Sequence, residues 1–198
     1  MLRQLGPRDY ALALDGAKIV PALTTGTPPP DYGQLGRPST HPAHVILREN
    51  LHGGRCWNMS TVDGQVGIAL PEIIRPTAVA IEHLPVEIAD EDGIQAPHDM
   101  RLWGLLEGRA NIERHDALAP QEHISSVGPP ITGGYTFVRL ADFEYDVSAP
   151  GHIQAFPIDP RMRRAALEFA VFVIEVLNNW GGNATCLYRV HIHGHGVR

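Results

Sequence analysis

Short apolar segments recur along the chain and predict β-strands separated by turns. Alternating or β-branched-rich stretches are typical of strands that bury one face. They occur at residues 65–70, 77–83, 99–105, 135–143, 152–156 and 185–193. Glycine (20 residues) and proline (17 residues) interrupt the apolar positions often, which favours many turns. The pattern predicts an all-β domain.

Residues 164–177 fit either a helix or a strand. The first five, Arg-Ala-Ala-Leu-Glu, favour a helix, whereas Phe-Ala-Val-Phe-Val-Ile-Glu-Val at 169–176 is aromatic and β-branched. Residues of the second kind pack well on the pleated surface of a sheet. We therefore predict a central strand in this stretch.

One predicted strand brings a histidine onto an apolar face. In residues 77–83, Val79, Ile81 and His83 occupy alternate positions. Because side chains alternate along a strand, these three share one face. We expect His83 to point toward an interior or a cleft.

Two stretches interrupt this rhythm of strands. Residues 21–44 are rich in proline, including positions 28–30, and proline cannot donate the ladder hydrogen bonds of a central strand. Residues 107–134 are polar and predict a long surface insertion. Neither stretch looks like a domain boundary. We therefore predict a single domain over residues 1–198, opened by an N-terminal segment at 1–20.

Composition narrows the class of protein. With 198 residues, 43% hydrophobic and 19% charged, the chain can fill a core and is not disordered by composition. A net charge of −6 without basic clusters argues against a nucleic-acid surface. The apolar run at 169–177 is too short to span a bilayer, and residues 1–20 lack the apolar core of a signal peptide. We expect a soluble domain whose targeting and membrane segments, if it works in a lumen, lie upstream.

Catalytic signatures are missing from the sequence. It contains no Gly-x-Ser-x-Gly elbow, phosphate loop or dinucleotide fingerprint. Asp90, Glu91 and Asp92 precede Gly93 and are typical of a solvated acidic turn. The sequence therefore predicts that the protein is not an enzyme.

Three histidines alternate near the end of the chain. On a strand, His191, His193 and His195 would share one face, and such a set can bind zinc. Gly194 and Gly196 indicate that the strand frays there, and no carboxylate ligand is evident. Solvated histidines at the end of the last strand are the favoured interpretation.

Cys56 and Cys186 are the only cysteines and lie 130 positions apart. This spacing excludes a zinc knuckle, whose ligands lie two to four residues apart. Spacing leaves open a disulfide, which persists only in an oxidising compartment, or two separate buried thiols. Asn58 and Asn183 each begin an N-glycosylation sequon.

Motifs along most of the chain resemble the SUN domain, the Sad1/UNC-84 module of inner nuclear membrane proteins, and suggest a fungal member. In the family's order they are DYAL (9–12) with GA (16–17), GRCW (54–57), GQVGI (64–68), IRPTAV (74–79), EHLP (82–85), APHD (96–99), FEYD (143–146), QAF (154–156), NWG (179–181), TCLYR (185–189) and HG (193–194). Each motif alone is weak, but their ordered conjunction is specific.

The resemblance implies a compact antiparallel β-sandwich, jelly-roll-like in form. Such a domain binds the extreme C-terminus of a KASH-domain protein in the perinuclear space. Together the two form the LINC bridge that links the nucleus to the cytoskeleton across the nuclear envelope. By the match, His83 and Tyr188 hydrogen-bond the terminal carboxylate of the peptide. Gln95 and Ala184 belong to the same pocket, where animal members have a small hydroxyl residue and an aromatic one.

The resemblance also implies a covalent brace and a bound ion. Cys56 and Cys186 match the family's internal disulfide, which braces a loop at residues 45–55. Backbone carbonyls of that loop would coordinate a monovalent cation, expected to be potassium. The expected ligands are the carbonyl oxygens of Val45, Arg48, Asn50, Arg55 and Tyr188.

The chain also departs from the family pattern. Residues 21–44 stand where the family has a lid, a hairpin that adds a strand to the bound peptide. Proline at 28–30 argues against strand addition here. No third cysteine occurs near Thr24, so we predict no disulfide to the partner. The family assembles as a trimer through an upstream coiled coil, and this fragment alone is expected to be a monomer.

Two other functions stay open on the sequence. One is a SUN-like protein of the endoplasmic reticulum without a KASH partner. The other is a carbohydrate-binding β-sandwich, because a shared fold does not fix function. The three tryptophans, Trp57, Trp103 and Trp180, lie in expected structural motifs and offer no evident sugar-binding platform.

Overall fold

The computed structural model describes residues 8–26, 41–49, 51, 53–85, 88, 93–118 and 128–197. Most of its regular structure is β-strand, as the sequence predicted. The strands are β1 (Lys18–Val20), β2 (Trp57–Asn58), β3 (Gly64–Glu82), β4 (Asp99–Leu105), β5 (Phe137–Glu144), β6 (Ile153–Pro157), β7 (Phe169–Val176), β8 (Cys186–Leu187) and β9 (Arg189–Gly196). The helices are α1 (Arg109–Asp116), α2 (Pro160–Arg164) and the 3-10 helices η1 (Ala13–Asp15), η2 (Pro21–Leu23) and η3 (Ala43–Leu47).

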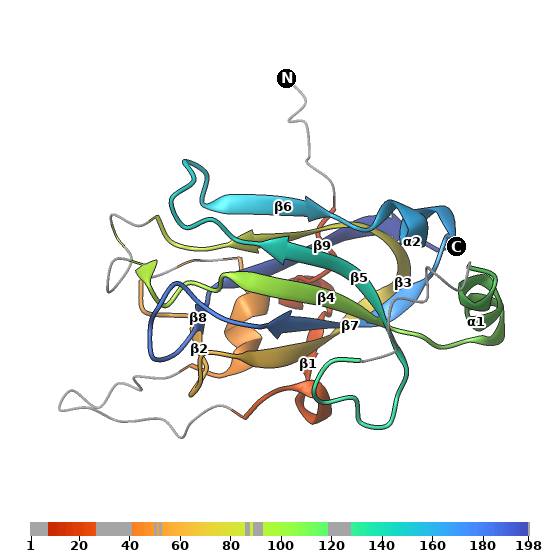
Figure 1. The fold of residues 1–198 in the computed structure, drawn as a ribbon, viewed down its shortest axis with the longest axis horizontal. Helices are drawn as coiled ribbons and strands as arrows, with labels where there is room; N and C mark the ends of the chain where they lie inside the picture. Colours follow the sequence, from red (N-terminus) through yellow and green to blue (C-terminus); the bar gives the residue numbers. More distant parts are fainter. Residues whose placement is uncertain are drawn as a thin grey trace.

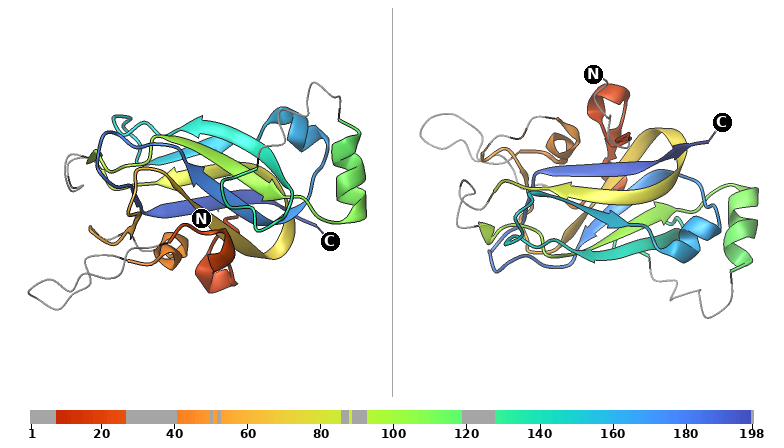
Figure 2. Two further views of the ribbon diagram at one scale, coloured as in Figure 1. Left: turned by 60° about the horizontal axis from the view of Figure 1, so that its bottom comes forward. Right: turned by 90° about the horizontal axis from the view of Figure 1, so that it is seen from above.

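The long strand β3 joins the two layers of a sandwich. Its first half pairs with β1 and β7, and its second half pairs with β6 and β9, in each case antiparallel. From β7 the first layer continues through β4 to β5. Figure 2 shows the two layers, with β3 bending from one to the other. The predicted antiparallel β-sandwich is therefore confirmed.

One strand stands where the sequence pattern predicted two. Pro71 and Pro76 lie inside β3 and cannot donate ladder hydrogen bonds. The pairing shifts register between Ala69 and Ile74 beside β7, and between Pro76 and Ala78 beside β9. These β-bulges let the strand bend between the layers without ending.

The hydrophobic core lies between the layers. Alternate residues of β3, β7 and β9 fill it and are fully buried: Val66, Ile68, Val79, Ile81, Phe172, Ile174, Val190 and Ile192. Burying each such side chain stabilises the fold by about 1.5–3 kcal/mol. β7 lies between β3 and β4, so the predicted central strand is confirmed for Phe169–Val176. The helix-favouring residues before it follow α2, which ends at Arg164.

A buried arginine fixes the N-terminal segment to β9. Arg189 is only 2% exposed. Its guanidinium donates to the carbonyls of Ala11 and Ile46, each at 2.9 Å, and to the carboxylate of Asp9. One side chain thus ties the N-terminal segment and η3 to the strand that follows Tyr188.

The stretch predicted as a surface insertion includes a helix. α1 is held against the sandwich by Asn111, whose side chain donates to the carbonyl of Glu168 at 2.8 Å and accepts from its N–H at 2.9 Å. Residues 119–127 of the stretch lie outside the described residues. The helix was not predicted, because its docking depends on this contact with a segment far along the chain.

Figure 1 shows the molecule as an elongated sandwich with two distinct ends. α1 and α2 lie at one end, and the β2–β8 pair lies at the other. Of the predicted lid, residues 27–40 lie outside the described residues, and residues 21–26 pack on β3, where Leu23 is buried. Within the described residues, no helix is long and apolar enough to cross a membrane.

Candidate functional site

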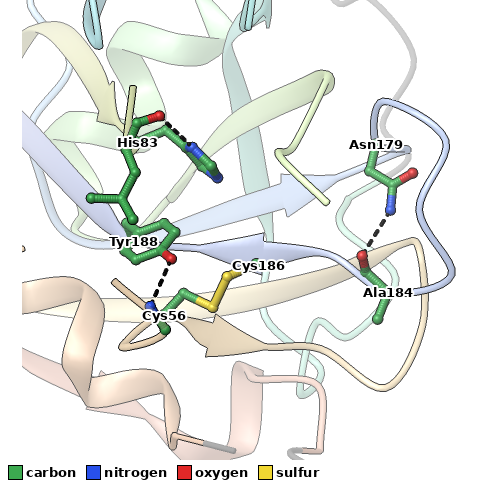
Figure 3. The surroundings of a disulfide bond; sticks show 8 residues. Cys56, His83, Asn179, Ala184, Cys186 and Tyr188 are labelled. Carbon is green, nitrogen blue, oxygen red and sulfur yellow. Dashed lines mark hydrogen bonds between the residues drawn. A yellow bond between two sulfur atoms is a disulfide. The ribbon is translucent and has the colours of Figure 1, made fainter. Parts of the chain in front are cut away.

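A disulfide joins Cys56 to Cys186 beside the short β2–β8 pair. Their Cα atoms lie 5.4 Å apart, and the strands place Trp57 opposite Leu187. Both cysteines are buried, together with Leu84 and Tyr188. The disulfide is therefore the correct alternative of the two that cysteine spacing left open, and Figure 3 shows its surroundings.

His83 and Tyr188 lie together next to this disulfide, each only 3% exposed. Their ring centroids are 4.8 Å apart and the planes meet edge to face at 82°. The Tyr188 hydroxyl accepts a hydrogen bond from the Gly54 N–H at 3.2 Å, which orients it beside the cysteine loop. Val79 and Ile81 are also buried, so the predicted inward orientation of His83 is confirmed.

The two nitrogens of His83 have different surroundings. Nδ1 lies 3.1 Å from the Leu84 carbonyl, which can only accept, so Nδ1 carries a proton. Among the described residues, Nε2 of His83 is the one buried side-chain nitrogen or oxygen without a hydrogen-bond partner. Burial lowers the pKa of His83, although backbone groups of Leu84 and Cys186 favour its protonated form. The ring is therefore mainly neutral at pH 7, with Nε2 unprotonated.

An unpaired buried nitrogen is costly. Leaving one polar group without a partner costs about 1–3 kcal/mol, and native proteins retain few such groups. A ligand that hydrogen-bonds Nε2 would remove this cost. His83 Nε2 is therefore the atom that most clearly indicates a binding site.

Tyr145 is a neighbour that the sequence analysis did not assign to the site. Its ring centroid lies 6.0 Å from that of His83, and its hydroxyl donates to the His152 carbonyl at 3.1 Å. Burial, together with the charge of Glu82, raises its pKa to about 12, so it stays protonated. Its position within a matched motif was the available signal, but only the fold brings its ring to His83.

The other two predicted pocket residues are placed differently. The Gln95 carbonyl accepts from the Cys186 N–H at 2.8 Å, so this residue reaches the disulfide through its backbone. Ala184 lies on the turn with Asn179, whose amide donates to its carbonyl at 3.0 Å. Figure 3 draws this turn across the disulfide from His83 and Tyr188. The structure thus brings His83 and Tyr188 together and sets Ala184 apart.

The predicted cation loop begins as a helical turn. η3 covers Ala43–Leu47, and the Val45 carbonyl accepts the Arg48 N–H at 3.1 Å. The carbonyls of Arg48 and Arg55 accept no hydrogen bond from another described residue. Asn50 lies outside the described residues. The cation site therefore stays a prediction.

The C-terminal histidines have specific partners. His191 places Nδ1 3.0 Å from Asp9 and Nε2 3.0 Å from Glu82, and these carboxylates raise its pKa above the usual value despite burial. His193 Nδ1 lies 3.0 Å from the Arg8 carbonyl, and its ring stacks on that of His191 at 6.0 Å. The expectation of a solvated side chain is thus wrong for His191, since its carboxylate partners come from distant segments.

A different group has the geometry of metal ligands. His98, Asp99 and Glu144 place one ligand atom each within 4.8 Å of one another. His98 Nε2 already lies 2.8 Å from a Glu144 oxygen, and Asp99 is partly exposed while Glu144 is exposed. Contacts within the group explain its arrangement. Sequence reasoning missed it because Glu144 belongs to a different strand.

Comparison with known families gives a match to the Sad1/UNC-like C-terminal family over residues 36–119 and 125–196. Both cysteines, His83 and Tyr188 lie in the matched parts. The match also runs through α1 and omits residues 120–124 of the predicted insertion.

Two of the curated relatives are named as SUN domain-containing proteins. The chain is 27% identical to SUN domain-containing protein 3 of Bos taurus and 27% identical to SUN domain-containing protein 2 of Mus musculus, over 96% of its length in each case. It covers 48% and 23% of these two proteins. It is 31% identical to sperm-associated antigen 4 protein of Mus musculus over 77% of the chain. These mammalian relatives do not test the expectation of a fungal member.

Solved structures of similar shape establish the fold alone. A family 32 carbohydrate-binding module from Streptococcus pneumoniae EndoD superposes with a TM-score of 0.59 at 11% identity, covering 94% of this chain and 99% of the module. A putative chitobiase fragment from Bacteroides thetaiotaomicron gives 0.61 at 10% identity, covering 99% and 96%. Such low identity carries no functional conclusion. Because the family match spans most of the residues and includes the disulfide and the His83–Tyr188 pair, this chain belongs to the Sad1/UNC-like (SUN) domain family.

Proposed function

We propose that this chain is a lumenal SUN domain that binds the C-terminal tail of a KASH-domain protein. In this role it is a non-enzymatic anchor, one half of a LINC bridge between nucleus and cytoskeleton. Family membership supports this role, and the unpaired Nε2 of buried His83 is the observation that carries it. The terminal carboxylate of a peptide would accept a hydrogen bond from this nitrogen once it takes up a proton.

The chemistry of the pair suits a carboxylate. A protonated imidazole donates a charge-assisted hydrogen bond, which is about twice as strong as one between neutral groups. The Tyr188 hydroxyl lies beside it and is oriented by the Gly54 N–H. Because only the last residue of a chain has a free main-chain carboxylate, this pair would read the end of the peptide.

The disulfide and the cation loop would support this pocket. The covalent bond holds the segment that contains Gly54 against the segment that contains Tyr188. Carbonyls of Val45, Arg48, Arg55 and Tyr188 would hold a potassium ion and stiffen the same loop. A structural disulfide persists in an oxidising compartment, which supports placement in the perinuclear space.

The wider assembly follows from the same family role. Segments of a longer protein outside this sequence would anchor the domain in the inner nuclear membrane and assemble it as a trimer. Asn183 is exposed on its turn and is the favoured glycosylation site, whereas Asn58 is partly buried opposite Cys186. The isolated domain is expected to be a monomer.

Carbohydrate binding is the second candidate function, because sugar-binding modules share the fold. Sugar sites commonly stack a ring on an exposed aromatic, and here Trp57 and Trp103 are buried. Trp180 donates to the Tyr145 carbonyl at 3.0 Å, and its ring meets that of His98 edge to face. The described tryptophans thus have roles within the domain.

The SUN-like protein without a KASH partner differs from the main proposal only in lacking the peptide ligand.

Calorimetric titration with KASH-tail peptides tests the proposal. Replacing His83 by Ala, or Tyr188 by Phe, is expected to weaken binding by at least about tenfold, which is 1.4 kcal/mol. Tyr135→Phe is the matched control, because Tyr135 is 61% exposed and lies in another loop. Unchanged affinity of both site variants would reject carboxylate capture, and binding on a glycan array without peptide binding would favour the lectin function.

A further inference from the structure

A second pocket lies at the end of the molecule remote from the disulfide. It has a volume of about 350 Å³ and opens between α1 and α2, which lie close together in Figures 1 and 2. Arg114, Ala117 and Leu118 line it from the side of α1, and Arg161, Arg164 and Ala165 line it from the side of α2. Three arginines around one cavity, in a chain of net charge −6, make this end distinct.

Contacts with nearby backbone carbonyls and carboxylates explain the positions of only two of the three arginines. Arg114 donates to the Ala110 carbonyl at 3.2 Å and to the Ala166 carbonyl at 2.5 Å. Arg161 forms a two-pronged ion pair with Asp159, with its shortest contact at 2.6 Å. Arg164, by contrast, is exposed and makes no hydrogen bond or ion pair with a described residue. Its charge helps to lower the pKa of Asp159, but no hydrogen bond to a described residue fixes its guanidinium.

The charges around the pocket do not balance. Glu168 is shared by Arg75 at 2.6 Å and Arg114 at 3.2 Å, and Asp159 pairs with Arg161. These arginines lower the pKa of the Asp159 and Glu168 carboxyl groups. Both groups are therefore ionised, and each contributes one negative charge at this end of the molecule. Arg75 lies outside the lining, so three guanidinium groups at the pocket, those of Arg114, Arg161 and Arg164, face two carboxylates, and positive charge is in excess.

The backbone directly after Ala165, a lining residue of the pocket, is strained. Ala166 has a φ of 51°, and it is the one non-glycine residue with positive φ among those described. This conformation costs an L-residue about 1–2 kcal/mol. It turns the Ala166 carbonyl toward Arg114 and so fixes the turn between Arg164 and Glu168. A strained backbone conformation persists where many surrounding contacts hold it in place, and such conformations cluster at binding sites.

From these observations we propose that this pocket binds a phosphate monoester. A phosphate anion matches the excess of positive charge at the pocket. Its oxygens suit the forked donors of guanidinium groups, which Arg offers in a fixed geometry. The volume is near the lower end of the range for small-molecule sites, about 300–1,000 Å³, and suits a compact headgroup. The ligand is thus a phosphorylated small molecule or the phosphorylated headgroup of a lipid.

Binding is measured by calorimetry with inorganic phosphate and with inositol monophosphate. Co-sedimentation with phosphatidylcholine vesicles, with or without phosphatidylinositol monophosphate, measures binding to the lipid headgroup. We expect saturable binding that Arg164→Glu weakens by at least about tenfold. Arg109→Glu is the matched control, because Arg109 has a 93% exposed side chain, pairs with Glu113 and does not line the pocket. It makes the same change in net charge and is expected to alter affinity by less than about twofold.

The outcomes separate the ligand sources from failure of the proposal. Binding of soluble inositol monophosphate would assign a small-molecule ligand, and binding seen only on phosphorylated vesicles would assign the lipid headgroup. No saturable binding by the folded wild-type domain would overturn the proposal. Equal losses in the Arg164 and Arg109 variants would also overturn it, because they would indicate diffuse charge attraction. Both substitutions are on the surface, and thermal unfolding checks that each variant is folded.

Discussion

At the scale of single residues, His83 combines burial with an unsatisfied nitrogen. Its position after Val79 and Ile81 allowed its orientation to be predicted, because strand alternation is a local property. Its lack of a partner at Nε2 was not predictable, since that depends on every segment packed around the ring. The same limit applies to His191, whose partners Asp9 and Glu82 come from distant positions.

Binding of a peptide carboxylate is expected to depend on pH through His83. Burial lowers the pKa of the free ring, so donation from Nε2 requires uptake of a proton on binding. Affinity for a free-acid peptide should therefore rise as the pH falls from about 7.5 to 6, by up to about tenfold per unit. Calorimetry across this range measures it. His83→Gln should remove the dependence, and an affinity that falls with falling pH would contradict the assignment.

A second pH effect is expected in the stability of the domain. The pKa of His191 is raised by Asp9 and Glu82, so its protonated form stabilises the native state. This contribution is present in full below the unfolded pKa of about 6.5 and is lost as pH rises through the higher folded value. Denaturant unfolding of wild type and His191→Gln should differ most near pH 6 and converge at higher pH. A difference that grows with pH would reject this ion pair. Arg189 and His152 also face these carboxylates, and both are unchanged in the comparison.

At the scale of elements, strands were predictable where burial follows a simple period. β4 matches its predicted range, and β5 and β6 differ by one or two residues at their ends. The sequence pattern predicted two strands where β3 is one, because prolines interrupt the pattern. In the structure the pairing continues past these prolines through β-bulges. α1 was missed because most of its residues are polar and it docks through Asn111 rather than through an apolar stripe.

Close packing between β4 and β7 is tested at Gly104. A Cβ added there would lie 2.6 Å from the ring of Phe169, closer than real side chains approach. Gly104→Ala should therefore lower the free energy of unfolding by about 1–3 kcal/mol, measured in denaturant. Gly151→Ala is the control, because its nearest neighbour would be 3.7 Å away. Equal free energies of unfolding for the two variants would contradict the close approach of Gly104 to Phe169.

The covalent link between β2 and β8 is tested by removing both cysteines. The double variant Cys56→Ser, Cys186→Ser should lose about 2–5 kcal/mol of unfolding free energy, because the bond closes a loop of 130 residues. Mass measurement after alkylation without reductant should find no free thiol in the wild type. Two alkylated cysteines in the folded protein would contradict the pairing and remove the support for an oxidising compartment.

At the scale of the whole molecule, the two ends have different chemistry. The disulfide end holds the His83–Tyr188 pair, and the α1–α2 end holds the arginine pocket. Arg189 connects the N-terminal segment to the strand that begins directly after Tyr188. The same segment also contacts this strand through the Tyr10 N–H, which donates to the Ile192 carbonyl at 2.8 Å, and through Asp9, which lies 3.0 Å from His191. A pull on this segment would therefore reach the strand beside the peptide site. This arrangement suits a domain proposed to transmit force.

Resemblance to the family gave the identity of the site residues, and physical reading of the sequence did not. Tyr188 lies between two strands, so no periodicity marked it as part of a pocket. The cysteine pairing likewise followed from the neighbours of Cys56 and Cys186 and not from their spacing. Ala184 was carried over by position alone, and the structure sets it apart from His83.

The central claim is that the domain reads a free peptide C-terminus through His83. The most direct test is calorimetric titration of the wild-type domain with one KASH-tail peptide in two forms, with a free C-terminal carboxylate and with a C-terminal amide. We predict that the amide binds at least about tenfold more weakly, because it lacks the negative charge that would pair with the protonated imidazole. Equal affinities for the two forms would contradict it.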